Sequence, residues 1–162
     1  MKNNQIIAFL NIVLVTSLVG EDAVLGKLEI LDQRMSDFFD SDPCIEVLAT
    51  GFNWSEGPVW VPKLNGVLFS DVPENKAFLW TEKKGLEVFL DPSGYTGYTT
   101  SKKKGGSNGL ALDQKGNLIL CQQGDRRIAM FNQWESKSPK YETIVDRFET
   151  KRFSSPNDLV IS

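Results

Sequence analysis

The pattern of hydrophobic and polar residues along the chain changes near residue 45. Before that position there is one apolar run, at residues 6–19, and then an acidic stretch without alternation. After it, β-rich runs of four or five residues recur, and turn-forming residues such as Asn65 and Gly66 separate them. Such runs at spacings near ten residues predict an all-β fold. The predicted strands are residues 45–49, 57–61, 67–70, 77–81, 86–90, 110–113, 118–121, 128–132 and 142–145.

These runs also repeat as a group. Residues 57–60 align with 109–112, residues 66–69 with 116–119, and residues 75–80 with 126–131, while 155–160 resemble a third opening. Four short strands at a period near fifty residues are typical of a β-propeller blade. We therefore predict that residues 44–162 form a partial β-propeller with about two blades and the first strand of a third. The alternative is a complete, small β-sandwich.

Residues 1–20 have the pattern of a secretory signal peptide. Lys2 precedes the apolar run, and Gly20 leads into acidic residues. The run is shorter than the roughly twenty apolar residues of a membrane-spanning helix. The sequence predicts export to the periplasm or the outside of the cell, with an uncleaved N-terminal anchor or a buried element as alternatives. Residues 21–43 are predicted to be a linker with room for one short helix.

The composition restricts the chemistry. The chain has no histidine, so it can supply neither a Ser-His-Asp triad nor a histidine-rich zinc site. Its net charge is 18 − 21 = −3, and residues 102–104 are its only basic cluster, which argues against nucleic-acid binding. A small-molecule or protein partner fits better. Cys44 and Cys121 lack the spacing of metal ligands, and the sequence leaves open whether they pair.

The openings of the repeats carry the candidate chemistry. Glu56, Asn108 and Asn157 occupy equivalent positions, 52 and 49 residues apart. Equivalent openings converge at one end of a propeller channel, and carboxylate and amide oxygens suit a hard cation such as calcium. Each residue also has a plainer interpretation. Asn108 with Gly109 could form a turn, Asn157 could cap one, and Glu56 could be a solvated acid.

Several motifs in order resemble one family. These motifs are residues 52–60, 68–72, 91–97, 106–110, 124–127 and 155–160. Together they resemble the gluconolactonase, senescence marker protein and regucalcin family, and the gluconolactonase branch in particular. The resemblance covers residues 45–162. It implies a six-bladed β-propeller that holds one divalent cation, usually calcium, and hydrolyses a sugar lactone to the aldonic acid.

The same resemblance implies roles for single residues. Glu56 and Asn157 would be metal ligands, and Asn108 would contact the substrate or reach the metal through water. Gln123 stands where the gluconolactonase branch often has histidine, so we assign it to substrate binding. The family's further ligand, an aspartate that also serves as base, would lie beyond Ser162. No catalytic residue is therefore expected in this chain, which is predicted to be inactive alone.

Two other functions stay open at this point. The chain could belong to a non-catalytic propeller that binds a ligand or protein, or it could be a truncated product without function. Arg126 and Arg127 could bind an anion or form an ordinary salt-bridged edge. Residues 94–106 are predicted to be an exposed loop near the pocket, either a lid or a loop without function. The aromatic side chains predicted to pack between blades are Trp54, Trp60, Phe69, Phe78 and Trp80.

Overall fold

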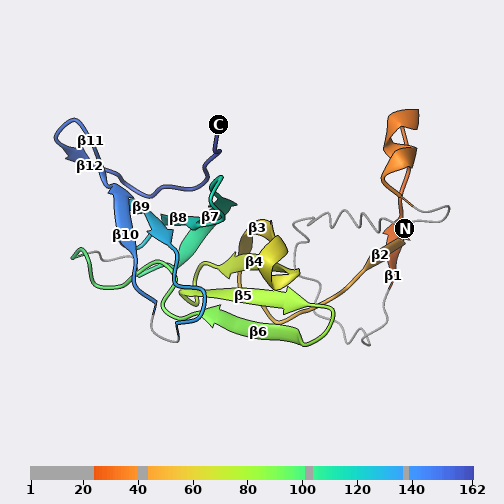
Figure 1. Cartoon of the computed structure of the whole chain (residues 1–162), viewed down its shortest axis with the longest axis horizontal. Helices are drawn as coiled ribbons and strands as arrows, with labels where there is room; N and C mark the ends of the chain where they lie inside the picture. The colour runs from red at the N-terminus through yellow and green to blue at the C-terminus, as the bar shows by residue number, and fades with distance from the viewer. Residues whose placement is uncertain (1–23, 40–43, 101–103, 137–138) are drawn as a thin grey trace. The chain divides into compact units, whose positions relative to one another are not determined.

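The computed structural model of the chain describes residues 24–39, 44–100, 104–136 and 139–162 (Figure 1). The predicted leader, residues 1–20, lies outside the described residues. The described part contains β-strands and two short 3-10 helices but no α-helix, and none of its helices has the length and apolar character needed to cross a membrane. The elements are β1 (Val24–Lys27), η1 (Gln33–Asp37), β2 (Cys44–Glu46), β3 (Ser55–Val61), η2 (Pro62–Leu64), β4 (Gly66–Asp71), β5 (Lys76–Thr81), β6 (Gly85–Leu90), β7 (Ser107–Leu112), β8 (Leu118–Gln122), β9 (Arg127–Phe131), β10 (Glu142–Val145), β11 (Arg147–Phe148) and β12 (Lys151–Arg152).

The chain divides into two compact units, Met1–Thr50 and Gly51–Ser162. In the first unit, β1 pairs antiparallel with β2. Helix η1 begins after Asp32, whose carboxylate accepts a hydrogen bond from the Arg34 backbone N–H at 2.9 Å. The carboxylate thereby satisfies one of the free donors at the start of the helix. Strand β1 was not predicted, and the strand predicted at residues 45–49 already ends at Glu46.

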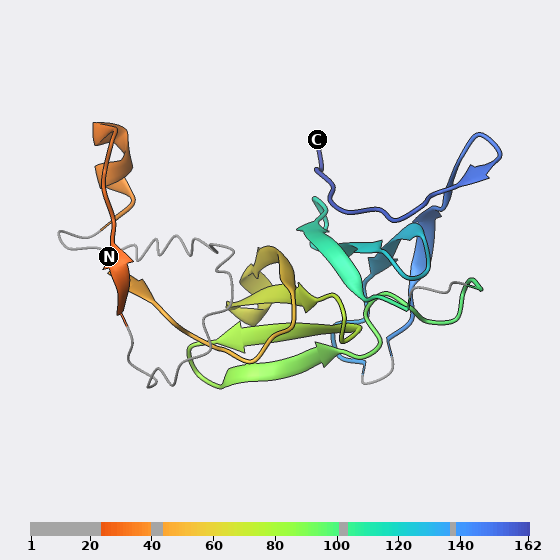
Figure 2. The ribbon, with the colours of Figure 1, turned by 180° about the vertical axis from the view of Figure 1, so that it is seen from behind.

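The second unit contains two four-stranded antiparallel sheets. The first sheet has the order β3-β4-β5-β6, and the second has the order β7-β8-β9-β10. Within each sheet, every strand therefore lies beside the next one in the sequence, as Figures 1 and 2 show. All eight of these strands were predicted, with bounds that differ by no more than three residues. A further hairpin, β11–β12, was not predicted.

The strand registers confirm that the two sheets are copies of one unit. Asn75 and Arg126, in the turns after β4 and β8, both have positive φ, at 57° and 60°. One predicted alignment is wrong by one residue, because the registers equate Val67 with Leu118. The cause is the connection between the first two strands. Six residues, 61–66, separate the paired residues Trp60 and Val67 in the first sheet, whereas five residues, 113–117, separate Leu112 and Leu118 in the second.

Aliphatic side chains fill the space between the two sheets. Phe131, which is 1% exposed, is the largest member of this core, and the rings of Phe89, Trp134 and Tyr141 surround it. Removing these groups from water is the main stabilising contribution to the unit. The buried core residues are Val61, Leu68, Ala77, Leu79, Leu90, Leu110, Leu118, Leu120 and Phe131.

The predicted packing of the aromatic residues does not hold for these two sheets. Leu68 and Leu79 face the second sheet, so Phe69 and Phe78, each one residue away along its strand, point to the opposite face. There they pack with Phe52, whose ring centroid lies 4.8 Å from that of Phe69 and 5.2 Å from that of Phe78. Strand alternation puts Trp60 and Trp80, which both pair with Val67, on that same face. Trp60 is 47% exposed and Trp54 is 63% exposed.

Candidate functional site

The three repeat openings lie side by side in space. Gly57, next to Glu56, touches the second opening so closely that an added Cβ would lie 2.3 Å from the Asn108 carbonyl oxygen. Gly109, next to Asn108, touches the third opening in the same way. Its Cβ would lie 2.5 Å from Asp158 Oδ1 and 2.9 Å from the Asn157 carbonyl oxygen. Only glycine permits such approaches of one backbone to another.

Hydrogen bonds join two of the predicted site residues directly. Asn108 Nδ2 donates to Asn157 Oδ1 at 2.6 Å, and the Gly109 backbone N–H donates to the Asn157 carbonyl at 2.7 Å. Glu56 is linked to this pair only through its neighbour Gly57, which contacts the Asn108 backbone. Its Oε1 accepts from Trp54 Nε1 at 2.9 Å. Asn108 is 8% exposed, Glu56 is half-buried and Asn157 is exposed.

The backbone that carries Asn108 is held by buried hydroxyl groups. Ser70 Oγ, from β4, donates to the Asn108 carbonyl at 2.9 Å and lies 2.7 Å from Ser107 Oγ. The register of β7 shifts between Ser107 and Leu110, so that Asn108 and Gly109 together oppose Cys121 of β8. A bulge of this kind redirects a side chain out of the strand's alternation. The first sheet has a matching register shift between Glu56 and Val59.

Gln123 lies at the same end of the second sheet. It follows Gln122, which pairs with Ser107, and it is half-buried. Its Oε1 would be 3.3 Å from a Cβ on Gly105, so it lies against the backbone that leads into β7. A hollow of about 200 Å³ occupies the opposite end of the first sheet and is not part of this site. It is lined by Leu64, Asn65, Leu79, Thr81, Lys83, Lys84 and Glu87.

Trp54 is a site neighbour that sequence reasoning assigned to packing. Asp71, which is 1% exposed, accepts hydrogen bonds from the backbone N–H groups of Asn53 and Trp54 at 3.0 and 3.1 Å. The Trp54 carbonyl accepts from the Val72 N–H at 3.1 Å. The signal that could have revealed it is its spacing of two residues from Glu56, because side chains two apart in extended chain share a side.

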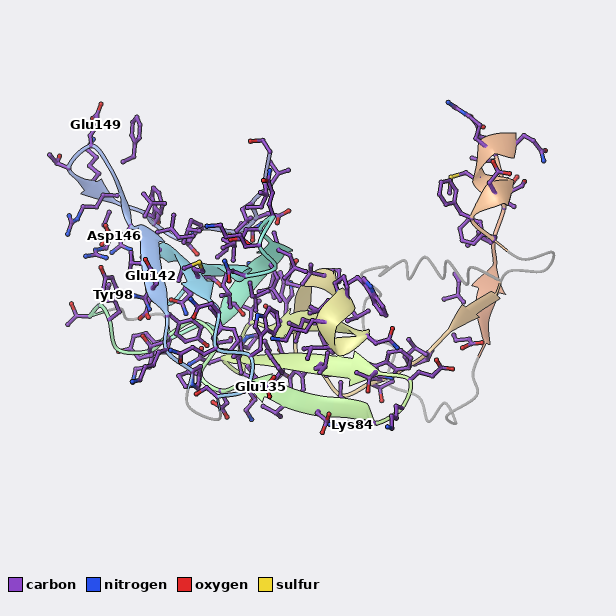
Figure 3. All side chains as sticks on the ribbon, in the orientation of Figure 1. Lys84, Tyr98, Glu135, Glu142, Asp146 and Glu149 are labelled. Atoms are coloured by element: carbon purple, nitrogen blue, oxygen red, sulfur yellow. The ribbon has the colours of Figure 1, made fainter. Side chains whose placement is uncertain are left out.

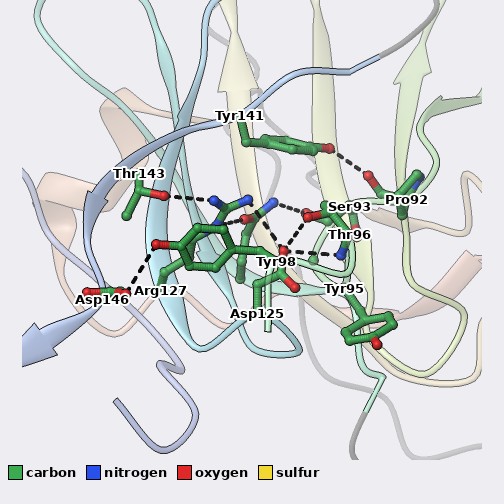
Figure 4. Close-up of polar contacts among 12 residues, drawn as sticks. Pro92, Ser93, Tyr95, Thr96, Tyr98, Asp125, Arg127, Tyr141, Thr143 and Asp146 are labelled. Atoms are coloured by element: carbon green, nitrogen blue, oxygen red, sulfur yellow. Dashed lines mark hydrogen bonds and ion pairs between the residues drawn. The ribbon is translucent and has the colours of Figure 1, made fainter. Parts of the chain in front are cut away.

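A buried ion pair fixes the connection between the two sheets (Figure 4). Asp125 is fully buried and Arg127 is 4% exposed, with 3.3 Å between Asp125 Oδ2 and Arg127 Nη2. Asp125 Oδ2 also accepts from the Thr96 N–H at 3.1 Å and from Thr96 Oγ1 at 2.5 Å. Burial lowers the pKa of the Arg127 guanidinium, and the Asp125 charge opposes that shift.

Tyr98 covers this ion pair. The Arg127 Cζ lies 4.1 Å from the centroid of the Tyr98 ring, and the Tyr98 hydroxyl donates to Asp146 Oδ2 at 3.2 Å. Figure 3 shows Tyr98 and Asp146 near one another beside the second sheet. Thr96 and Tyr98 are thus bound to the second sheet, which does not support a lid in this part of the predicted loop. Arg126 is also engaged, since its Nε donates to the Phe153 carbonyl at 2.6 Å.

Cys121 is a free, buried thiol. Burial, with a smaller contribution from the charge of Asp158, raises the pKa of the Cys121 thiol to about 12. The thiol is therefore protonated at neutral pH and is a poor nucleophile and metal ligand. Asp158 contacts Gly109 and lies close enough to Cys121 for its charge to act on the thiol.

The donor set fits a hard cation by its chemistry. One carboxylate, from Glu56, and the amide groups of Asn108 and Asn157 come from three adjacent segments and offer oxygen atoms, which calcium prefers. Within the described ranges, no three histidine, cysteine, aspartate or glutamate side chains gather closely enough to hold a metal. A cation at the repeat openings would therefore depend on the amide oxygens as well as on Glu56.

Comparison with known proteins identifies the family of the chain. The family model described as the SMP-30/gluconolactonase/LRE-like region matches residues 54–162, a range that includes all four predicted site residues. The chain belongs to this family. A gluconolactonase from Zymomonas mobilis subsp. mobilis (strain ATCC 31821 / ZM4 / CP4) is 35% identical to the chain over 142 residues. Those residues are 86% of this chain and 39% of that relative, so the chain spans about two fifths of its length.

Two solved structures of family members resemble the chain. A gluconolactonase from Xanthomonas campestris, described as important in glucose secondary metabolic pathways, matches with a TM-score of 0.62 and 27% identity. The match covers 75% of this chain and 36% of that one. An X-ray structure of a proposed gluconolactonase matches with a TM-score of 0.59 and 36% identity, over 71% of this chain and 35% of that one.

Proposed function

We propose that this chain is part of a metal-dependent hydrolase that opens a sugar lactone of the gluconolactone type to its aldonic acid. In this proposal, the two sheets are the first two blades of a six-bladed propeller, and residues 155–162 begin the third. The observation that carries the proposal is the contact of the three repeat openings, which brings Glu56, Asn108 and Asn157 into adjacent segments.

Each residue has a defined task in this proposal. Glu56 and Asn157 hold a divalent cation, for which calcium is the best candidate because every donor is oxygen. When bound, the cation polarises the lactone carbonyl and acidifies the attacking water. The Asn108 side chain, oriented by its hydrogen bond to Asn157, contacts the lactone, and Gln123 contributes a neutral hydrogen-bonding amide.

In this proposal, the residue that accepts the proton of the attacking water is not among residues 1–162. A carboxylate base beside the cation would take the proton of the attacking water, and in our proposal it comes from a later blade. We therefore propose that the 162-residue chain alone does not turn over lactone. We also propose that the whole protein is exported, with residues 1–20 as its signal peptide or anchor, and that it binds no nucleic acid.

The test compares calcium binding with lactone hydrolysis in the longest expressed product that contains residues 1–162. Titration calorimetry with calcium chloride should give binding that Glu56→Gln abolishes, and hydrolysis of glucono-δ-lactone should stop with that variant and with chelator. Glu87→Gln is the matched control, because Glu87 lies at the far end of the first sheet in a surface ion pair with Lys84.

Two results would count against the proposal. If Glu56→Gln binds calcium and hydrolyses lactone as Glu87→Gln does, Glu56 is no ligand and the metal site fails. If the product binds calcium through Glu56 but never hydrolyses lactones, the non-catalytic propeller replaces the enzyme.

A further inference from the structure

Trp54 combines features that set it apart from the other tryptophans. Its side chain is 63% exposed, yet its backbone is fixed on both sides, by Asp71 through the N–H and by Val72 at the carbonyl. Its indole Nε1 donates to Glu56 Oε1 at 2.9 Å. An exposed tryptophan that is anchored at both its backbone and its ring nitrogen has little conformational freedom left to lose when a ligand binds.

The comparison with Trp60 and Trp134 strengthens this point. Trp134 packs its ring against Phe89 and Phe131 and so contributes to the core. Trp60 is 47% exposed, but it lies on the outer face of the first sheet beside Val67. Trp54 alone among these three directs its ring nitrogen to a carboxylate of the proposed site.

We propose that Trp54 is both a positioning residue and a substrate-binding residue of the lactone site, an inference that rests on the proposed function. The indole N–H holds Oε1 of Glu56 and leaves the other carboxylate oxygen available to a cation. The exposed ring face receives the C–H face of the sugar ring. Sugars present polar edges and apolar C–H faces, and an aromatic ring attracts such C–H groups through weak contacts that bury apolar surface.

The two roles can be separated by two substitutions. Trp54→Phe keeps an aromatic face but loses the N–H, so calcium affinity should fall by roughly tenfold, the usual effect of losing a hydrogen bond to a charged group. At saturating calcium its KM for glucono-δ-lactone should stay near that of the unsubstituted protein. Trp54→Ala loses both features, so its KM at saturating calcium should also rise, by roughly three- to tenfold, with kcat little changed.

Trp60→Phe is the matched control, because Trp60 is a second exposed tryptophan and lies on the outer face of the first sheet. Calcium affinity is measured by calorimetry, so one readout does not depend on catalysis, and thermal unfolding reports whether each variant folds. If both Trp54 variants match Trp60→Phe in calcium affinity and KM, the inference is overturned. It is also overturned if Trp54→Phe and Trp54→Ala raise KM equally at saturating calcium, since the ring face then contributes nothing.

Failure of this inference can be told apart from failure of the proposed function. If Glu56→Gln abolishes calcium binding while the Trp54 variants bind normally, only the role of Trp54 is wrong. If the unsubstituted protein shows no calcium binding that depends on Glu56, the proposed metal site fails and the inference fails with it. Should Trp54→Ala not fold, Trp54→Phe alone decides the role of the N–H through the calcium affinity.

Discussion

The first and second sheets follow the same path with different side-chain chemistry. Asp71 and Gln122 occupy equivalent positions at the ends of β4 and β8, and both are fully or almost fully buried. Each binds the connection that leads into its own sheet. Asp71 accepts from two backbone N–H groups, whereas Gln122 Nε2 donates to the Ser93 carbonyl at 3.0 Å. Each sheet therefore has a buried polar side chain at the same position that binds the segment leading into the sheet; we call this side chain the clamp. Whether that segment offers N–H donors or a carbonyl acceptor decides whether the clamp is a carboxylate or an amide.

The turns that follow β4 and β8 differ more strongly in the burial of their charged residues. Glu74 and Lys76 in the first sheet correspond to Asp125 and Arg127 in the second, with the same signs of charge. Glu74 is exposed and accepts a hydrogen bond from the Asn53 side chain, while Asp125 and Arg127 are buried beneath Tyr98. Both sheets therefore have an acidic and a basic residue at these two positions. Only the pair in the second sheet is buried, because the segment that contains Tyr98 covers it.

Breaking the buried pair should have the largest effect. Arg127→Met leaves Asp125 buried without its counter-charge, so the free energy of unfolding should fall by about 3–5 kcal/mol. The equivalent Lys76→Met should cost less than about 1 kcal/mol. Urea unfolding followed by circular dichroism measures both. Adding Asp125→Asn to Arg127→Met should recover part of the loss, and equal losses at positions 76 and 127 would refute the distinction between the sheets.

The second largest loss of stability should come from a substitution at the close contact between the first two repeat openings. Gly57→Ala places a methyl group against the Asn108 backbone at a positive φ of 57°, so we expect a loss of about 2–4 kcal/mol in unfolding free energy. Gly85→Ala has a positive φ of 70° but open space, and should cost about 1 kcal/mol. Thermal denaturation of the two variants separates steric contact from backbone strain. A similar cost for both would show that the contact contributes nothing.

The clamp of the first sheet should come third. Asp71→Asn replaces one acceptor oxygen by an N–H₂ group that faces the N–H of Asn53 or Trp54, so stability should fall by about 2 kcal/mol. Asp113→Asn is the control, since Asp113 accepts similar hydrogen bonds in an exposed turn. Its cost should be below about 1 kcal/mol. Chemical denaturation of both variants provides the comparison, and an Asp71→Asn protein as stable as the parent would exclude the clamp.

The smallest effect concerns Cys121, the counterpart of Ser70 in the second sheet. Because the folded pKa is raised from 9.0 to about 12, the thiolate fraction at pH 8 should be about a thousandfold lower in the folded state than in the unfolded state. Iodoacetamide should thus modify a Cys44→Ser protein at pH 8 only in denaturant. Rapid modification of the folded protein would contradict the burial.

The same shift has a defined sign for stability. The folded protein binds this proton more tightly than the unfolded chain, so the contribution is complete below pH 9 and is lost as the pH rises toward 12. Cys121→Ala should abolish the fall in the free energy of unfolding between pH 9 and pH 12. Near pH 7 the free energy of unfolding should change little.

The sequence was sufficient for the parts that repeat. Strands β3 to β10 were predictable because each has a β-rich run bounded by turn residues, and the period placed Glu56, Asn108 and Asn157 at matching openings. Hairpin β11–β12 was missed because strands of two residues carry no pattern. The burial of Asp125 depends on segments that meet only in the folded chain, so no local pattern indicated it. The hydrogen bond of Trp54 to Glu56 did have a local signal, the spacing of two residues, but that spacing alone does not distinguish a hydrogen bond from packing.

Gly57 and Gly109 separate the geometry of the proposed site from its chemistry. Main-chain contacts set the distance from one opening to the next, and the side chains at positions 56, 108 and 157 merely project from that frame. Exchanging those side chains would alter which ion or ligand is favoured while the frame stays in place. The two glycines thus allow the side chains of the proposed site to change during evolution while the backbone that positions them stays the same.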